Sequence, residues 1–168
     1  MNDISTCSIN KNASVPRGTL AFLFKSTVKN DTMIEYKTIS KANKKDIIDL
    51  YESVNWTNYT QNPNSLLQGI QNSLCLIGAF KGNRIIGLIR IIGDGCTIIY
   101  VQDLLVHPEY QYQGIGQELM RKILNEYVHV RQKVLLTDTS EILDSFYQKT
   151  GFISASSLGL TCYVKLSS

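Results

Sequence analysis

The residues best suited to chemistry are two glycines, Gly114 and Gly116, which stand between a β-forming run and an amphipathic run with helical spacing. The first turn of a helix carries unpaired N–H groups and the positive end of the helix dipole. Backbone without side chains lets an anion approach those groups closely. This pattern predicts an anion-binding turn. The alternative is an ordinary tight turn between a strand and a helix.

Two common nucleotide-binding loops do not fit this turn. A Walker loop needs a Lys-Ser/Thr pair after its second glycine, but Gln117 and Glu118 follow Gly116. A dinucleotide fingerprint needs a third glycine, and Leu119 stands in its place. The anion must therefore belong to another kind of ligand.

Alternating strand and helix patterns surround the turn. Period-two or continuous apolar runs predict strands at residues 34–39, 74–80, 84–92, 97–106, 133–137, 152–156 and 160–166. Apolar spacing and capping residues predict helices after Asn43, from Pro63, at residues 114–127 and at residues 140–149. The expected order is β-α-α-β-β-β-α-β-α-β-β, with the strand at 133–137 parallel to its neighbour through a helical crossover.

Two motifs carry a resemblance to a known family. Residues 111–116, QYQGIG, match the Q/R-x-x-G-x-G/A signature of the GNAT superfamily of acyl-CoA-dependent N-acetyltransferases, and residues 145–152, SFYQKTGF, resemble its F-Y-x-x-x-G-F segment. The resemblance covers residues 34–166. It implies an α+β fold with three α/β/α-like layers: a mixed, mostly antiparallel sheet with splayed central strands, flanked by helices.

The resemblance names acetyl-CoA as the ligand of the turn, with no metal. Its pyrophosphate would bind backbone N–H groups of Gln113, Gly114, Ile115, Gly116 and Gln117. The splayed strand would leave backbone groups near Leu105 and Val106 to pair with the pantetheine arm. The side chains of Gln111 and Gln113 either contact phosphate or are solvated bend residues.

The resemblance also suggests the catalytic residues. Tyr147 matches a tyrosine that lies near the thioester sulfur in the family, and is the expected proton donor; its alternative is a helix residue packed on the sheet. Asp103 and Asp138 match acidic positions of glucosamine 6-phosphate N-acetyltransferases, and either could orient or deprotonate the amine. The alternative for both aspartates is capping of local N–H groups.

Acceptor recognition is expected from the loop at residues 55–60 and the hairpin at residues 90–95. Trp56 and Tyr59 could stack on the amine, while Arg90 and Asp94 could bind its polar end. Alternatively, Trp56 covers the open sheet.

The reaction predicted is direct transfer of an acetyl group from acetyl-CoA to a primary amine, with a small-molecule acceptor. No Cys-His pair indicates an acyl-enzyme. Two alternatives remain: a GNAT-like module that binds acyl-CoA without transfer, and an enzyme acting on protein lysines or N-termini.

Composition limits the classes of partner and the cellular location to be expected. The chain has 168 residues, 43% of them hydrophobic, and a net charge of +3 without basic clusters, which argues against nucleic acid as a partner. No apolar run is long enough for a membrane span. The cysteines show no metal-ligand spacing and indicate a reduced, cytoplasmic protein. The terminal LTCYVKLSS segment offers a strand edge, so the protein is expected to be either a monomer or a homodimer. Residues 33–168 are expected to form the acetyltransferase domain, and residues 1–32 a poorly ordered extension or an early start site; the short apolar TLAFLF stretch lacks the other features of a signal peptide.

Overall fold

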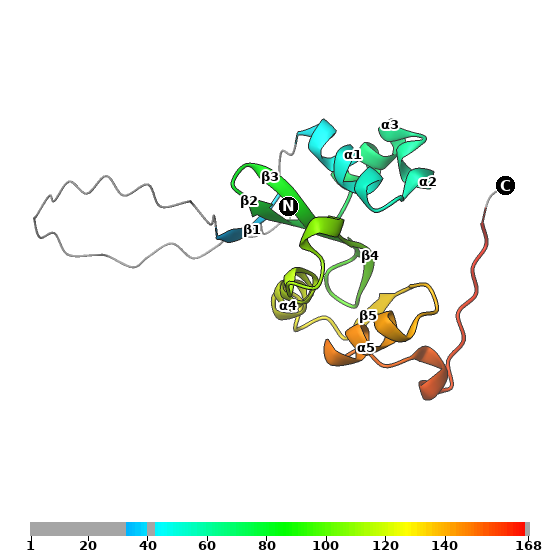
Figure 1. Cartoon of the computed structure of the whole chain (residues 1–168). Coiled ribbons are helices and arrows are strands. Elements are labelled where there is room, and N and C mark those ends of the chain that lie inside the picture. The colour runs from blue at the N-terminus through cyan, green and yellow to red at the C-terminus, as the bar shows by residue number, and fades with distance from the viewer. Residues whose placement is uncertain (1–32, 40–42, 167–168) are drawn as a thin grey trace, which may run out of the picture. The chain divides into compact units, whose positions relative to one another are not determined.

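A computed structural model describes residues 33–39 and 43–166 (Figure 1). The expectations for residues 1–32, including Cys7 and the TLAFLF stretch, lie outside this part of the chain. The described strands are β1 (Ile34–Thr38), β2 (Cys75–Lys81), β3 (Arg84–Gly93), β4 (Ile98–Val106) and β5 (Gln132–Leu135). The helices are α1 (Lys44–Ser53), α2 (Thr57–Thr60), α3 (Pro63–Gln71), α4 (Ile115–Glu126) and α5 (Glu141–Lys149), with short 3-10 turns η1 (Pro108–Tyr110) and η2 (Ala155–Leu158).

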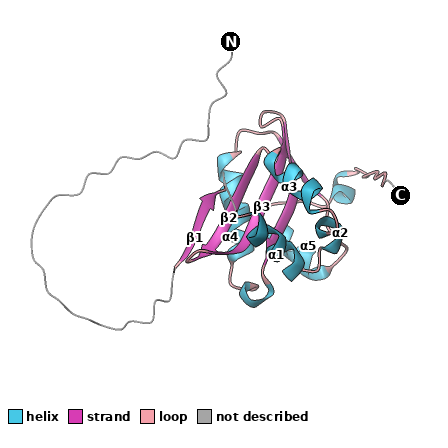
Figure 2. Cartoon of the chain, turned by 90° about the horizontal axis from the view of Figure 1, so that it is seen from above, coloured by secondary structure: helices cyan, strands magenta, loops and turns pink. Residues whose placement is uncertain are grey.

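The described strands form one sheet in the order β1-β2-β3-β4-β5. Figure 2 shows its first strands, β1, β2 and β3, side by side. β1 to β4 pair antiparallel, and short turns join β2 to β3 and β3 to β4. β5 pairs parallel with β4, since α4 returns the chain across the sheet between them. This confirms the predicted mixed, mostly antiparallel sheet.

Capping residues set the starts of two helices. The Asn43 side chain accepts from the N–H of Lys45 at 3.0 Å and starts α1. The Asn62 side chain accepts from the N–H of Ser65 at 3.2 Å, and Pro63 follows as the first residue of α3. Both starts agree with the sequence patterns.

Helices cover the two faces of the sheet. On one face, α4 buries Ile115, Leu119, Met120 and Ile123 against apolar residues of β2, β3 and β4. On the other face, α1 and α3 bury Leu50, Tyr51 and Leu66 against a second apolar cluster. In Figure 1, α1, α2 and α3 group together, apart from α4. In the described part of the chain, no helix is long and apolar enough to cross a bilayer.

A β-bulge interrupts β4 at its centre. Arg90 of β3 lies opposite Asp103, whereas the next residue, Ile91, lies opposite Val101, so that Gln102 is an extra residue without a partner in β3. Such a bulge bends its strand and reverses which face the following side chains point to. Pairing between β4 and β5 ends at Val101, immediately before the bulge. β4 therefore continues for five residues without β5 beside it.

Two predictions about the C-terminal part are wrong. The sequence pattern predicts two strands within residues 152–166, but the described chain has only the turn η2 there, and residues 153–166 are exposed. The residues of β5 are half-buried or exposed, because no strand covers its outer edge in the described chain. The short helix α2 lies in a segment predicted as a loop.

Candidate active site

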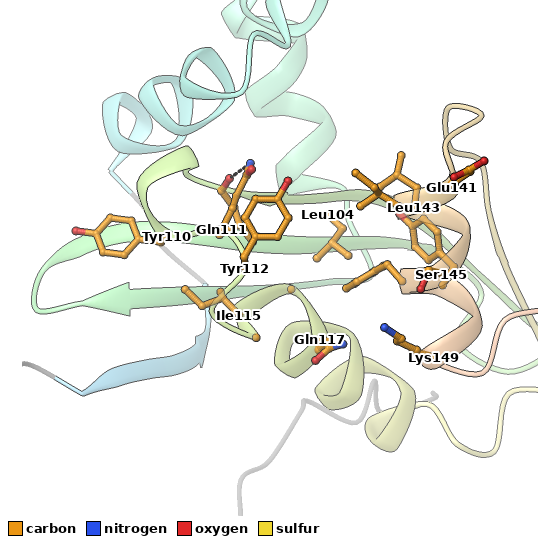
Figure 3. Close-up of a pocket in the computed structure, with 16 residues that line it drawn as sticks. Leu104, Tyr110, Gln111, Tyr112, Ile115, Gln117, Glu141, Leu143, Ser145 and Lys149 are labelled. Carbon is orange, nitrogen blue, oxygen red and sulfur yellow. Dashed lines mark hydrogen bonds between the residues drawn. The ribbon is translucent and has the colours of Figure 1, made fainter.

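A cleft of about 740 Å³ opens between the end of β4, the start of α4 and the length of α5 (Figure 3). Its lining residues are Leu104, Val106, Tyr110, Gln111, Tyr112, Gly114, Ile115, Gly116, Gln117, Glu141, Ile142, Leu143, Ser145, Phe146, Tyr147 and Lys149. The QYQGIG and SFYQKTGF segments, which lie 28 residues apart, thus form two walls of one cavity. The volume lies in the range typical of sites for small molecules and cofactors.

The free side of β4 forms the floor of the cleft. The N–H of His107 donates to the carbonyl of Ile86 at 2.8 Å, and antiparallel pairing alternates between residues that face their partner and residues that face away. Counting back from His107, the backbone groups of Val106 and Leu104 point away from β3, toward the side that β5 has left. Leu105 instead turns its backbone to β3 and buries its side chain against the α1 layer. Sequence reasoning missed Leu104 because strand pairing is not visible in the sequence.

The glycine turn meets two different requirements. Gly114 has φ of 79°, a left-handed conformation that precedes α4 and favours glycine. Gly116 has no such conformation, and a Cβ built on it would meet the Phe146 ring at 3.6 Å, an ordinary contact. The fold therefore requires glycine at position 114 but not at position 116. Without a Cβ, Gly116 leaves this part of the cleft wall open.

The first N–H groups of α4, those of Ile115, Gly116 and Gln117, have no acceptor within the helix. The N–H of Glu118 is the first that is satisfied, by the Gly114 carbonyl at 3.0 Å. Because Gly116 and Gln117 line the cleft, this helix end presents donors and a positive dipole to it. The arrangement suits a phosphate group.

The two glutamines of the motif hold the bend. The Gln111 amide donates to the Val106 carbonyl at 3.0 Å, and the Gln113 amide donates to the Glu109 carbonyl at 3.2 Å. Both side-chain amides are thus engaged with backbone. Sequence reasoning missed Tyr112, which is 90% exposed at the cleft, and Lys149, which points from α5 toward α4 in Figure 3.

Tyr147 reaches the cleft from α5. Its ring makes edge contacts with Phe146 and Phe152, at centroid distances of 5.1 and 6.1 Å. Burial raises the pKa of the Tyr147 phenol above its ordinary value, although a hydrogen bond with the Thr137 side chain lowers it in part. The phenol therefore stays protonated at neutral pH. It places a protonated hydroxyl group on the wall of the cleft.

Asp103 lies outside the cleft, because the bulge turns it into the α1 layer. Its side chain is buried and accepts hydrogen bonds from Arg90 Nε and, at 2.7 Å, from the Tyr51 hydroxyl. Arg90 also donates to the Gly69 carbonyl of α3 at 3.3 Å. Burial alone would lower the pKa of Arg90, but the Asp103 carboxylate raises it. This cluster joins α1 and α3 to the centre of the sheet, and neither charge is open to a ligand.

The aromatic residues of the loop pack on the same layer. Trp56 and Tyr59 stack with ring centroids 5.7 Å apart, and both contact Tyr51. The Gln102 amide donates to the Tyr59 hydroxyl at 3.1 Å, which ties the loop to the bulge of β4. Neither Trp56 nor Tyr59 lines the cleft.

The last two predicted aspartates lie in connecting segments, Asp94 after β3 and Asp138 after β5. Within the β3–β4 connection, Asp94 accepts hydrogen bonds from the Thr97 hydroxyl and from the N–H groups of Cys96, Thr97 and Ile98, and these bonds lower its pKa. Asp138 is exposed after β5 and does not line the cleft. No three His, Cys, Asp or Glu side chains in the described ranges gather as metal ligands would.

The family model of the acetyltransferase (GNAT) domain matches residues 39–161. The chain belongs to the GNAT acetyltransferase family. This confirms the resemblance seen in the two motifs. The strand-to-helix glycine turn and the separation of β4 from β5 thus lie in a GNAT domain.

Solved and curated proteins agree with this assignment. A GNAT family acetyltransferase from Streptococcus pneumoniae has the same fold, with 36% identity and a TM-score of 0.73 over 80% of this chain and 98% of that one. An aminoglycoside N-acetyltransferase, AAC(6')-Iy, is similar at 13% identity with a TM-score of 0.63, covering 81% and 98% of the two chains, which shows the fold alone. An uncharacterized ycf52-like N-acetyltransferase from Prochlorococcus marinus is 29% identical over 120 residues, 67% of this chain and 66% of that protein. The matched region of this GNAT chain thus spans about two thirds of that curated relative.

Proposed function

We propose that this GNAT protein transfers an acetyl group from acetyl-CoA directly to the primary amine of a small molecule. The observation that carries the proposal is one cleft bounded by three elements: the unpaired N–H groups of α4, the free backbone edge of β4, and the Tyr147 phenol. The similar protein AAC(6')-Iy has been solved in complex with CoA, which supports the choice of ligand. The predicted cytoplasmic location stays a prediction.

Three groups of residues would hold the donor. N–H groups of residues 115–117 bind the pyrophosphate, with the approach left open by Gly116. Backbone groups of Leu104 and Val106 pair with the amides of the pantetheine arm, as an added strand would. From the start of α4 toward α5, the cleft thus offers first the N–H groups of α4 and then the backbone groups of β4. Acetyl-CoA supplies the activated acyl group when bound.

The phenol of Tyr147 would donate a proton to the departing sulfur. Its raised pKa keeps the proton in place until charge develops on the thiolate. Of the two aspartates suggested by the resemblance, Asp138 is exposed and lies outside the lining of the cleft, so it takes the proton of the ammonium through water. Asp103 is engaged by Arg90 and Tyr51, so it acts as a positioning residue for the acceptor side.

The test is release of CoA thiol from acetyl-CoA with a panel of arylalkylamines, polyamines, amino acids, amino sugars and short lysine peptides. We expect turnover with one class of small amine, and a fall of about 100-fold in kcat for Tyr147→Phe with unchanged CoA affinity by calorimetry. Tyr36→Phe is the matched control, because Tyr36 lies in β1 and does not line the cleft.

Other outcomes point elsewhere. Turnover restricted to lysine peptides would replace the small-molecule acceptor by a protein. Tight CoA binding without release on any amine would favour a binding module. Absence of CoA binding would refute the role of the glycine turn.

A further inference from the structure

Tyr112 has a backbone conformation that is unusual for a tyrosine. Its φ is 60°, in the left-handed region that favours glycine. In the described part of the chain, Asn55 is the other non-glycine residue with a positive φ, and asparagine tolerates this region well. A bulky side chain does not, so the conformation of Tyr112 costs free energy and requires compensation from its surroundings or from a ligand.

The two neighbours of Tyr112 hold it in this conformation. The Gln111 side-chain amide donates to the Val106 carbonyl at 3.0 Å, and the Gln113 side-chain amide donates to the Glu109 carbonyl at 3.2 Å. Both neighbours are thus tied to the bend that precedes them. The residue between them has little conformational freedom, and its exposed side chain points away from the protein interior.

Packing within the protein does not offset the cost of this conformation. Tyr112 is 90% exposed, and within residues 33–39 and 43–166 its ring has no stacking, cation–π or hydrogen-bond partner. Glycine at this position would suit the backbone without exposing an aromatic ring to water. The ring instead lines the cleft, where the bend meets the start of α4 (Figure 3). A strained residue whose side chain lies at a ligand cleft indicates a contact with the ligand.

The chemistry of coenzyme A indicates which part of the ligand the ring would meet. In the proposed complex the pyrophosphate lies at the first N–H groups of α4, and the pantetheine arm runs along β4 toward Tyr147. The adenosine is attached to the other end of the pyrophosphate and stays near the glycine turn, where Tyr112 lies two residues before Gly114. The adenine base is the only aromatic group of coenzyme A, and a phenol ring stacks well on such a base.

We propose that the Tyr112 ring stacks on the adenine base of bound coenzyme A. This inference rests on the proposed function, because it requires coenzyme A in the cleft. The left-handed backbone lowers folding stability but places the ring where the base arrives, and the bound base then covers the exposed ring. Tyr112 therefore favours donors that carry adenosine over shorter pantetheine thioesters.

The test compares coenzyme A with 4′-phosphopantetheine, which has the same arm but no adenosine. In calorimetric titrations, Tyr112→Leu should bind coenzyme A about tenfold more weakly, while its affinity for 4′-phosphopantetheine is unchanged. Tyr112→Phe should bind coenzyme A within about twofold of the wild type, because it keeps the ring. With bound coenzyme A, nuclear Overhauser effects should join tyrosine ring protons to adenine H2 or H8, and Tyr112→Leu should lose them.

Two further variants separate the ring contact from the backbone strain. Tyr112→Gly should raise the midpoint of urea unfolding by about 0.3–0.5 M, because glycine adopts this backbone conformation at lower cost, yet it should bind coenzyme A about tenfold more weakly. Tyr163→Leu is the matched control, because Tyr163 is 92% exposed and does not line the cleft. Its affinity for coenzyme A should equal that of the wild type.

The outcomes distinguish this inference from the proposed function. A wild-type protein that does not bind coenzyme A would refute both. Wild-type binding that is unchanged in Tyr112→Leu, or that shows no contact between adenine and a tyrosine ring, would refute the stacking alone. Equal weakening of both ligands in Tyr112→Leu would place the ring on the arm or the phosphate, and would also overturn it.

Discussion

Alanine at Gly116 and at Gly114 should have opposite effects on stability. Gly116 is the second residue of α4, and the nearest atoms to a Cβ there are those of the Phe146 ring at 3.6 Å and of the Val106 side chain at 3.8 Å. Gly114 has open space around its Cβ position but a φ of 79°. Alanine at position 116 is therefore compatible with the backbone conformation. Alanine at position 114 has room for its methyl group but does not suit the backbone conformation.

The magnitudes follow from these contacts. Gly116→Ala should leave the free energy of unfolding unchanged or raise it by up to about 1 kcal/mol, because alanine favours the helix. Gly114→Ala should lower it by about 1–2 kcal/mol, the cost of a left-handed residue with a Cβ. The effect of Gly116→Ala on ligand binding should differ from its effect on stability. The added methyl group would separate phosphate oxygens from the N–H groups of α4. Loss of one charge-assisted hydrogen bond costs about 1.5–3 kcal/mol, so CoA affinity should fall about 10- to 100-fold.

Urea unfolding measures the first effect, and calorimetric titration with CoA measures the second. The combination expected for Gly116→Ala, normal or raised stability with weakened CoA binding, separates a ligand contact from a folding defect. Unchanged CoA affinity in this folded variant would refute the reasoning, because the pyrophosphate could not then approach the turn closely. Loss of stability in Gly116→Ala would show instead that glycine is needed there by the fold.

Two further predictions concern the buried cluster of Asp103, Arg90 and Tyr51 on the other face of the sheet. Asp103→Leu should lower the free energy of unfolding by about 3–5 kcal/mol, because Arg90 would stay buried without its partner. Asp103→Leu combined with Arg90→Met should restore most of this loss in urea unfolding, and equal losses in both variants would contradict an ion pair. Burial and the Asp103 carboxylate raise the pKa of Tyr51 far above its ordinary value. Above about pH 10 the unfolded chain therefore releases the phenol proton while the native chain keeps it. As a result, the free energy of unfolding falls as the pH rises. Tyr51→Phe should flatten this alkaline decline in urea midpoints measured between about pH 8 and 11, and an unchanged slope would show that other groups cause it.

Short sequence patterns were enough to predict most helices and strands, and the glycine turn at the start of α4. Asn43 and Pro63 mark helix starts through contacts with their own neighbours, and Gly114 is required by a single backbone angle. Such features depend on a few consecutive residues, which sequence reasoning can evaluate. The family motifs add the cleft wall from α5, because Tyr147 follows from its spacing within the SFYQKTGF segment.

Strand formation in the C-terminal part could not be judged in the same way. The LTCYVKL segment has the alternation and the β-forming residues of a strand, but a strand exists only with a neighbour. In the described subunit it has none, and η2 with Gly159 turns it away from β5. Its strand-like sequence pattern is therefore not sufficient to make it a strand in the described subunit.

The position of Asp103 differs from the expectation because β4 contains one extra residue. Simple alternation along β4 places Asp103 on the same face as Val101, toward α4; the extra residue Gln102 reverses this and turns Asp103 toward Arg90 and Tyr51. The same bulge marks the point where β4 leaves β5 and exposes the backbone of Leu104 to the cleft. The ligand floor and the buried ion pair thus have a common origin. A carboxylate placed after such a bulge is not open as a base while it is held by Arg90 and Tyr51.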